Sequence, residues 1–368
     1  MKKNDILEPL NGIKGIGAVI IAFFFHYGNF LSVDLSPLYC TLTRNLCENG
    51  WLMVELFFML SGIVFTLLYY PQINSGMKGI EFTVLRISRL YPMHLFTLCM
   101  VAVVQAIRNT CNLGQWCFIK NDLYHFILHI FMIHQFGFQS DNSFNQVSWT
   151  VSISVVLYFV FFWISRKSIQ KSGFLMCCLL MLVAGFAMIQ SNLYVFLNWP
   201  WIGRGMIAFF TGCIFDVVVS YEKINIKILD IVFICVLLIW ILFRACLWMS
   251  MDNNGWLVAC CYSIILFPAL VYFSIRIRVI RKILSGKAMK ALGKLSFSLF
   301  MIHYPIQLIL VTFNEIFSLE WNYETGRFCM LYIFCSMTAA YVALHYVEES
   351  ISGKIRKYYY DTMAAAGK

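Results

Sequence analysis

The chain has 368 residues, of which 61% are hydrophobic and only 12% are charged, and its mean hydropathy is +0.75. Soluble domains average about 25% charged residues, so this composition excludes a soluble globular protein and predicts a polytopic membrane protein. The 28 basic and 18 acidic residues leave a net charge of +10. In a membrane protein a basic excess mainly reports the orientation of the loops, and we expect no nucleic-acid partner.

Ten apolar windows are each long enough to cross a bilayer, which takes about 17 to 25 residues. They cover approximately residues 13–31, 51–70, 90–108, 149–165, 173–190, 203–219, 229–249, 256–274, 295–313 and 327–347. The apolar segment 123–139 is different, because counting it as a span would place Arg166, Lys167 and Lys171 outside, against the positive-inside rule. We expect it to be re-entrant or interfacial. The predicted fold is therefore all-α, with about ten transmembrane helices in a single domain over residues 1–368.

Basic residues also predict the orientation of the chain. With the N-terminus inside, 22 of the 28 Lys and Arg residues fall in the cytoplasmic segments, as the positive-inside rule requires. We therefore expect a multi-pass protein of the plasma (cytoplasmic) membrane with both termini in the cytoplasm. The sequence does not indicate an oligomeric state.

Four cysteines fall in predicted external loops, namely Cys40, Cys47, Cys111 and Cys117. An oxidising exterior permits disulfides between them, and four cysteines allow three pairings. The sequence does not distinguish pairs from free thiols.

Two ionisable side chains lie inside the first two spans. His26 is five residues from the outer end of its span and Glu55 is four residues inside the outer start of the next, so both lie about 6 to 8 Å below the outer boundary. Ionisable groups in a membrane segment are costly and usually line a pathway or a reaction site. His26 suits a general base, and Glu55 beside it would fix its tautomer. Alternatively, Glu55 is a structural partner of another donor, such as Arg204 at the same level.

Short motifs follow one another along most of the chain. They are LNGIKGI at 10–16 followed by His26, WLMVELFFMLSG at 51–62, RISRLYP at 86–92, WTVS at 149–152, Arg204-Gly205 leading to Gly212, LGKLSFS at 292–298 with His303-Tyr304-Pro305, and Val347-Glu348. This ordered series resembles the acyltransferase-3 family of integral membrane O-acyltransferases. The resemblance implies transfer of an acyl group, usually acetyl, from coenzyme A to a hydroxyl of a carbohydrate or other envelope molecule. The chain differs from the family pattern at Lys14, where arginine is usual, in the spacing from Lys14 to His26, and at Ser154, where glutamate is frequent.

Cationic side chains at the predicted inner mouth suit the donor of this reaction. Acetyl-CoA, or another acyl-CoA, carries phosphates and is made in the cytoplasm, so Lys14, Arg86 and Arg89 are candidates to bind it. They are otherwise ordinary positive-inside anchors. His303, about 12 Å along its helix from the inner side, either contacts the pantetheine arm or acyl group or is a neutral histidine bonded to a neighbouring helix.

Candidates for binding the acceptor lie at the outer side. Trp149, Ser152 and Ser154 begin the fourth span, where an aromatic ring and hydroxyl groups suit stacking and hydrogen bonding to a sugar, and Arg204 lies at the same level. Aromatic residues also enrich membrane interfaces for ordinary reasons. The expected partners are thus acyl-CoA, a carbohydrate or glycolipid acceptor, and the lipid bilayer.

Three histidines of the segment 123–139 invite a metal interpretation. His125 and His129 lie four residues apart on one helical face, and His134 follows. No flanking acid or cysteine completes a set of ligands, so we predict no metal and an interfacial helix instead.

A transporter or permease for a small polar solute or envelope precursor is the rival hypothesis. In that case His26, Glu55 and Arg204 would line the path of the solute. Transporters often contain two related halves, and the chain shows no such internal repeat.

Overall fold

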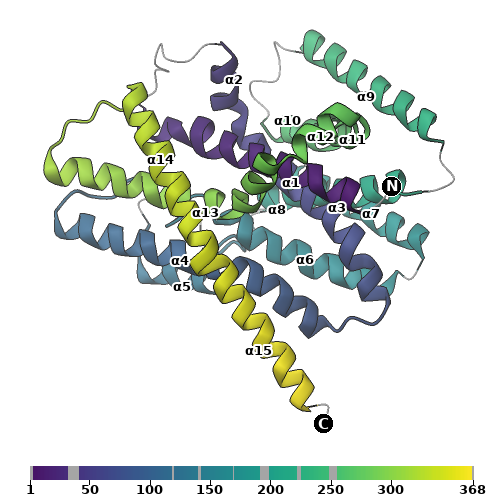
Figure 1. Ribbon diagram of the computed structural model, residues 1–368, viewed down its shortest axis with the longest axis horizontal. Helices are drawn as coiled ribbons and strands as arrows, with labels where there is room; N and C mark the ends of the chain where they lie inside the picture. Colours follow the sequence, from purple (N-terminus) through teal and green to yellow (C-terminus); the bar gives the residue numbers. More distant parts are fainter. Residues whose placement is uncertain are drawn as a thin grey trace. The chain divides into compact units, whose positions relative to one another are not determined.

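The computed structural model describes residues 3–31, 41–117, 120–139, 142–168, 170–190, 199–221, 225–247 and 255–366, and the regular structure within these residues is helical (Figure 1). In chain order the α-helices are α1 (Lys3–Ile20), α2 (Thr41–Asn49), α3 (Met53–Asn74), α4 (Gly79–Thr110), α5 (Leu123–Ile130), α6 (Trp149–Lys167), α7 (Lys171–Gln190), α8 (Trp199–Val219), α9 (Ile226–Leu247), α10 (Gly255–Cys261), α11 (Phe267–Arg276), α12 (Arg278–Leu284), α13 (Lys287–Phe317), α14 (Gly326–Ala343) and α15 (Ser350–Ala366). Shorter π- or 3₁₀-helical turns are η1 (Ile21–Phe25), η2 (His26–Phe30), η3 (Gly50–Leu52), η4 (Tyr262–Leu266) and η5 (Leu344–Glu349).

Nine helical segments among the described residues are long and apolar enough to cross a membrane, and they coincide with nine of the ten predicted spans. The remaining predicted span, 229–249, matches α9 as far as Leu247, and its last two residues lie outside the described part. Helix α5 has only eight residues, too few to cross a bilayer. The predicted fold class, an all-α polytopic membrane protein, is confirmed.

The chain divides into two compact units, each assembled from three separate stretches of sequence. Unit 1 comprises Met1–Gly17, Leu52–Lys78 and Ile153–Lys294, and unit 2 comprises Ala18–Trp51, Gly79–Ser152 and Leu295–Lys368. Because the stretches alternate along the sequence, neither unit is a continuous segment. The single domain expected over residues 1–368 stays a prediction.

Glycines let two helices of unit 1 approach closely. A Cβ atom on Gly62 of α3 would collide with the carbonyl oxygen of Phe209 on α8, and one on Gly212 of α8 would collide with the carbonyl oxygen of Met59 on α3. Membrane helices associate through such small residues because lipid tails provide no hydrophobic driving force between helices. The α3–α8 contact therefore depends on the missing side chains.

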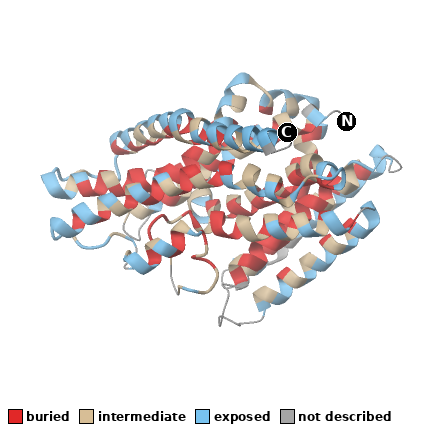
Figure 2. Cartoon of the chain, turned by 90° about the horizontal axis from the view of Figure 1, so that it is seen from below, coloured by how far each residue is buried: buried red, intermediate tan, exposed pale blue. Residues whose placement is uncertain are grey.

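Apolar side chains also cover outward-facing helix surfaces. Helices carry buried and exposed residues on different faces (Figure 2). In unit 1 the exposed faces of α7 and α9 include Leu180, Val183, Ile231 and Leu238. Large exposed apolar surfaces of this kind are unfavourable in water and suit a lipid surrounding.

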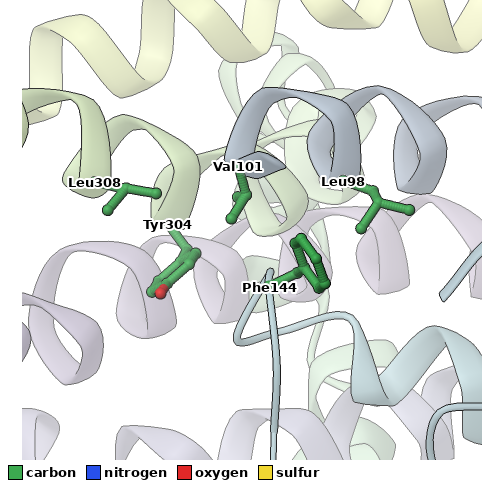
Figure 3. Packing of buried hydrophobic residues seen from close by; sticks show 5 residues of the cluster. All are labelled: Leu98, Val101, Phe144, Tyr304 and Leu308. Carbon is green, nitrogen blue, oxygen red and sulfur yellow. The ribbon is translucent and has the colours of Figure 1, made fainter. Parts of the chain in front are cut away.

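The core of unit 2 joins two long helices to an irregular segment. Leu98 and Val101 of α4 meet Tyr304 and Leu308 of α13, and Phe144 from the irregular stretch after α5 completes the cluster (Figure 3). All five side chains are at most 3% exposed. This packing anchors the stretch between α5 and α6 to α4 and α13.

We expect Gly62→Ala to destabilise the protein by about 1 to 3 kcal/mol, because the added methyl group meets backbone that can move only if α3 and α8 separate. Gly173→Ala is the matched control, since a Cβ there meets no atom of the described residues within 4 Å. The thermal midpoint of unfolding in detergent checks this. Equal midpoints for the two variants would contradict the close contact.

Candidate functional site

The first span changes its helical geometry next to His26. Helix α1 ends at Ile20, a π-helical turn follows over Ile21–Phe25, and a 3₁₀ turn runs from His26 to Phe30. Single π-helical turns are rare and often occur at functional sites. The apolar sequence around His26 predicted a continuous helix, so this irregularity is new information from the structure.

His26 is hydrogen-bonded to a second buried histidine, both in unit 2. Nδ1 of His26 lies 2.6 Å from Nε2 of His303, and their ring planes differ by 18°. Nδ1 of His303 is 3.1 Å from the carbonyl oxygen of Leu299, which can only accept. In a neutral His303 the proton therefore sits on Nδ1, and Nε2 accepts from the Nδ1–H of His26. This assignment leaves the lone pair of His26 on Nε2, the atom that can take up a proton.

Helix α13 holds the backbone at His26 as well as the ring. Gln307, one turn after His303, donates from Nε2 to the carbonyl oxygen of His26 at 2.7 Å. Its Oε1 accepts from Nδ2 of Asn29 at 3.1 Å, and Asn29 also donates to Oε1 of Gln146 at 2.9 Å. Residues four apart share a helix face, so the spacing of His303 and Gln307 in an apolar helix was a signal that the sequence analysis missed.

Glu55 forms a buried ion pair with Arg204 in unit 1. The two side chains are 1% and 5% exposed, and the guanidinium of Arg204 also lies 5.0 Å from the ring centroid of Trp201 and 5.3 Å from that of Trp256. Such cation–π contacts stabilise a desolvated arginine. The structure thus provides the alternative partner that the sequence analysis named for Glu55. His26 belongs to unit 2, and its pairing with Glu55 stays a prediction.

Arg89, a candidate for donor binding, is anchored by an acidic side chain of the same unit. Nη1 of Arg89 lies 2.9 Å from Oε1 of Glu348, and the other oxygen of Glu348 accepts from Ser298 at 2.6 Å. Glu348 is 1% exposed, whereas the side chain of Arg89 is 47% exposed. Arg89 is therefore held in place on one side while about half of it remains open.

The other donor-binding candidates are half-buried. Arg86 lies one turn before Arg89 on α4 in unit 2, whereas Lys14 lies on α1 in unit 1. Their expected convergence on one phosphate site stays a prediction.

The acceptor-binding candidates have different surroundings. The hydroxyl of Ser152 is fully buried, donates to the carbonyl oxygen of Met132 at 2.7 Å and accepts from the backbone N–H of Gln135 at 3.3 Å. Ser152 therefore holds the irregular stretch after α5. Trp149 and Ser154 are half-buried, and their predicted contacts with a sugar stay predictions.

The histidines of the α5 region form a different group from the one expected. His125 bonds to Asp122, with Nδ1 2.7 Å and the backbone N–H 2.9 Å from Oδ1. These two bonds lower the pKa of the exposed Asp122. His129 and His134 instead face His94 of α4, a residue that the sequence analysis did not consider.

The cysteines of the predicted external loops form no disulfide among the described residues. Cys47, Cys111 and Cys117 are free thiols, and burial raises the pKa of Cys117 to about 11. Cys40 lies outside the described residues.

Comparison with known proteins gives one match. A family model described as "Acyltransferase domain" matches residues 8–346, nearly the whole chain. No curated protein and no solved structure is similar enough to the chain to match it.

We expect Glu55→Ala or Arg204→Ala alone to cost about 3 to 5 kcal/mol of stability, because each leaves an uncompensated buried charge. The double variant Glu55→Ala/Arg204→Ala should lose less than the sum of the two single losses, because it removes both charges. Unfolding midpoints of the single and double variants measure this coupling. Asp230→Asn, which breaks the more exposed pair with Arg276, is the control and should change the midpoint little. Additive losses at Glu55 and Arg204 would rule out the pair as a coupled unit.

Proposed function

The chain belongs to this acyltransferase family, and from that premise we propose that it transfers an acyl group, most often acetyl, from acyl-CoA to a hydroxyl of a cell-envelope carbohydrate or glycolipid. It is a multi-pass membrane acyltransferase. The observation that carries the proposal is the buried pair of His26 and His303, which leaves a proton-accepting nitrogen on His26. Family membership also argues against the rival transporter hypothesis.

The chemistry needs a base because a sugar hydroxyl is a poor nucleophile near neutral pH. Nε2 of His26 takes the hydroxyl proton while the oxygen attacks the thioester carbonyl. The tetrahedral intermediate then collapses, the carbon–sulfur bond breaks, and the imidazolium returns the proton to the departing thiolate. The products are an ester and free coenzyme A, and His26 ends in its starting state.

His303 acts on this step through His26. Because Nδ1 of His303 donates to the carbonyl oxygen of Leu299, its Nε2 accepts the Nδ1–H of His26 throughout the reaction. This contact fixes the tautomer and the ring orientation, which is the task that a carboxylate performs in the Ser-His-Asp triad. His303 is thus a positioning residue in the proposed mechanism.

Burial of the pair suits transfer to a sugar rather than to water. His26 is 7% exposed and His303 is not exposed. Exclusion of water from the reacting atoms suppresses hydrolysis of a reactive thioester. An acceptor hydroxyl would then compete with few water molecules for the base.

The donor is proposed to bind with its phosphates near Arg86 and Arg89. Arginine grips phosphate through two parallel hydrogen bonds, and the contact with Glu348 holds Arg89 ready in one orientation. A cytoplasmic donor agrees with the expected cytoplasmic termini and plasma-membrane location, since the positive-inside rule places α4's first turns inside.

His26→Ala should lower acyl transfer by about 10²- to 10⁴-fold, the usual contribution of a general base. Acceptor-dependent release of thiol from acetyl-CoA by the purified protein measures this. His345→Ala, which changes a half-exposed histidine on η5, is the control and should retain activity. Full turnover by His26→Ala would refute the proposed mechanism.

His303→Ala should lower kcat with little change in KM, because the base loses its orientation rather than its substrates. His303→Gln should recover part of the activity, since the amide oxygen of glutamine can accept the Nδ1–H of His26. For each protein, kcat should rise with pH as His26 loses its proton and then level off. Equal rates for the two variants would contradict a positioning role.

Arg86→Ala and Arg89→Ala should each raise the KM for acetyl-CoA by about 10- to 100-fold, as expected for loss of a hydrogen bond between charged groups. A short acetyl thioester without phosphates provides the internal control, because its turnover should not change. Arg278→Ala, which removes an exposed charge on α12, is the matched control variant. Unchanged KM values would identify both arginines as simple membrane anchors.

A further inference from the structure

Three buried histidines of unit 2 come together outside the proposed active site. His94 lies on α4, His129 in the last turn of α5, and His134 in the irregular stretch that follows. Each is 1% exposed, and one ring nitrogen from each lies within 4.8 Å of the other two. The proposed acyl transfer uses none of them.

The hydrogen bonds of this cluster leave buried nitrogen atoms without partners. Nε2 of His94 donates to the carbonyl oxygen of His129 at 2.8 Å, so the proton sits on Nε2 and the lone pair on Nδ1. That Nδ1 atom is buried and has no hydrogen-bond partner among the residues that the structure describes, and the same holds for Nδ1 of His134. Buried polar atoms are normally satisfied, and an exception calls for an explanation such as a missing ion.

The backbone between His129 and His134 takes an unfavourable turn that brings the two rings together. Helix α5 ends with Met132 N–H bonded to the carbonyl oxygen of His129 and Ile133 N–H bonded to that of Leu128, each at 3.0 Å. Met132 has a φ of 55°, in the left-handed region that costs free energy for any residue with a side chain. The ring centroids of His129 and His134 are consequently 3.8 Å apart.

We propose that His94, His129 and His134 form a binding site for a divalent transition-metal ion of the zinc type, which ties the stretch after α5 to α4. Imidazole nitrogen suits Zn²⁺, Cu²⁺ and Ni²⁺, and three histidines with one open position are an established ligand set for Zn²⁺. Water or hydroxide would occupy the fourth position, and a hydroxide would offset one of the two positive charges of the ion.

The geometry allows this ligation with small movements. Because the three nitrogens lie within 4.8 Å of one another, some point lies no more than about 2.8 Å from all of them, compared with about 2.0 to 2.1 Å for a Zn–N bond. By distance alone each nitrogen needs to move by less than about 1 Å. The three rings are nearly parallel, with planes that differ by 7° to 14°, so they must also rotate to direct their lone pairs at the ion. The bond from Nε2 of His94 to a backbone carbonyl is also the arrangement that orients metal-bound histidines.

The sequence analysis predicted no metal because it grouped His129 and His134 with His125 and found no further ligand. In the structure His125 bonds to Asp122 instead. The third member of the histidine cluster is His94, which lies on a helix distant in sequence. The third ligand is thus a product of the tertiary fold.

Metal analysis of the full-length protein tests the site. The protein is purified in detergent through a tag without histidine, incubated with Zn²⁺, dialysed and measured by elemental mass spectrometry. We expect about one zinc ion per chain, and loss of most of it in His94→Asn and in His134→Asn. His125→Asn, which removes the neighbouring histidine outside the cluster, should keep it. Equal zinc content in all three variants, or no zinc in the unaltered protein, would overturn the proposal.

Two measurements keep the test valid if a variant folds poorly. In the unaltered protein, Co²⁺ should produce the intense visible absorption of a four-coordinate ion, and Zn²⁺ should abolish it by displacement. Zn²⁺ at a hundredfold excess over its Kd should also raise the unfolding midpoint by roughly 3 to 4 °C, and His125→Asn should respond in the same way. Absence of the cobalt spectrum, or of a zinc-dependent shift, would overturn the site independently of any variant.

Discussion

Polar side chains inside a membrane-spanning helix are costly unless they pair with other groups, so nearly all of them find partners within the protein. In unit 2 this constraint joins His26 to His303 and Gln307, and Arg89 to Glu348. In unit 1 it joins Glu55 to Arg204. The hydrophobic effect does not specify which helix faces meet in lipid, because lipid tails are as apolar as leucine. These polar contacts, together with the close packing at Gly62 and Gly212 in unit 1, therefore give each unit its specific arrangement.

The same constraint explains why the sequence predicted the spans but not the contacts. Apolar windows of sufficient length locate helices without knowledge of their neighbours, and nine such segments coincide with predicted spans in the described residues. The bond between His26 and His303 joins residues 277 positions apart. Nothing local in the sequence distinguishes it from the expected pairing of His26 with Glu55, because both partners place a polar group inside a neighbouring span.

Local irregularities were also beyond the sequence analysis, although parts of them left a signal. The π-helical turn before His26 lies in the run Ile21–Phe25, where the residues Ile, Ala and Phe are ordinary in a regular helix. By contrast, Gln307 stands four residues after His303 in an apolar helix, and helical spacing alone places both on one face. Attention to polar residues at such spacing would have identified Gln307. For His303 the sequence had already suggested a bond to a neighbouring helix as one of two alternatives, but not His26 as its partner.

Proton transfer inside a membrane protein favours a pair that starts without charge. Glu55 and Glu348 are each ion-paired with an arginine. A proton on Glu55 would leave the buried charge of Arg204 uncompensated, at a cost of several kcal/mol, and a proton on Glu348 would remove the ion-pair partner of the half-exposed Arg89. His26 and His303 carry no charge in the proposed resting state. In the proposed mechanism His26 accepts the proton of the acceptor hydroxyl while negative charge develops on the thioester oxygen, so the site gains an ion pair and no net charge. This difference makes the histidine pair a better proton acceptor than either buried carboxylate. At position 154, where the family often has glutamate, the chain has serine, so no carboxylate is present there to compete for the proton.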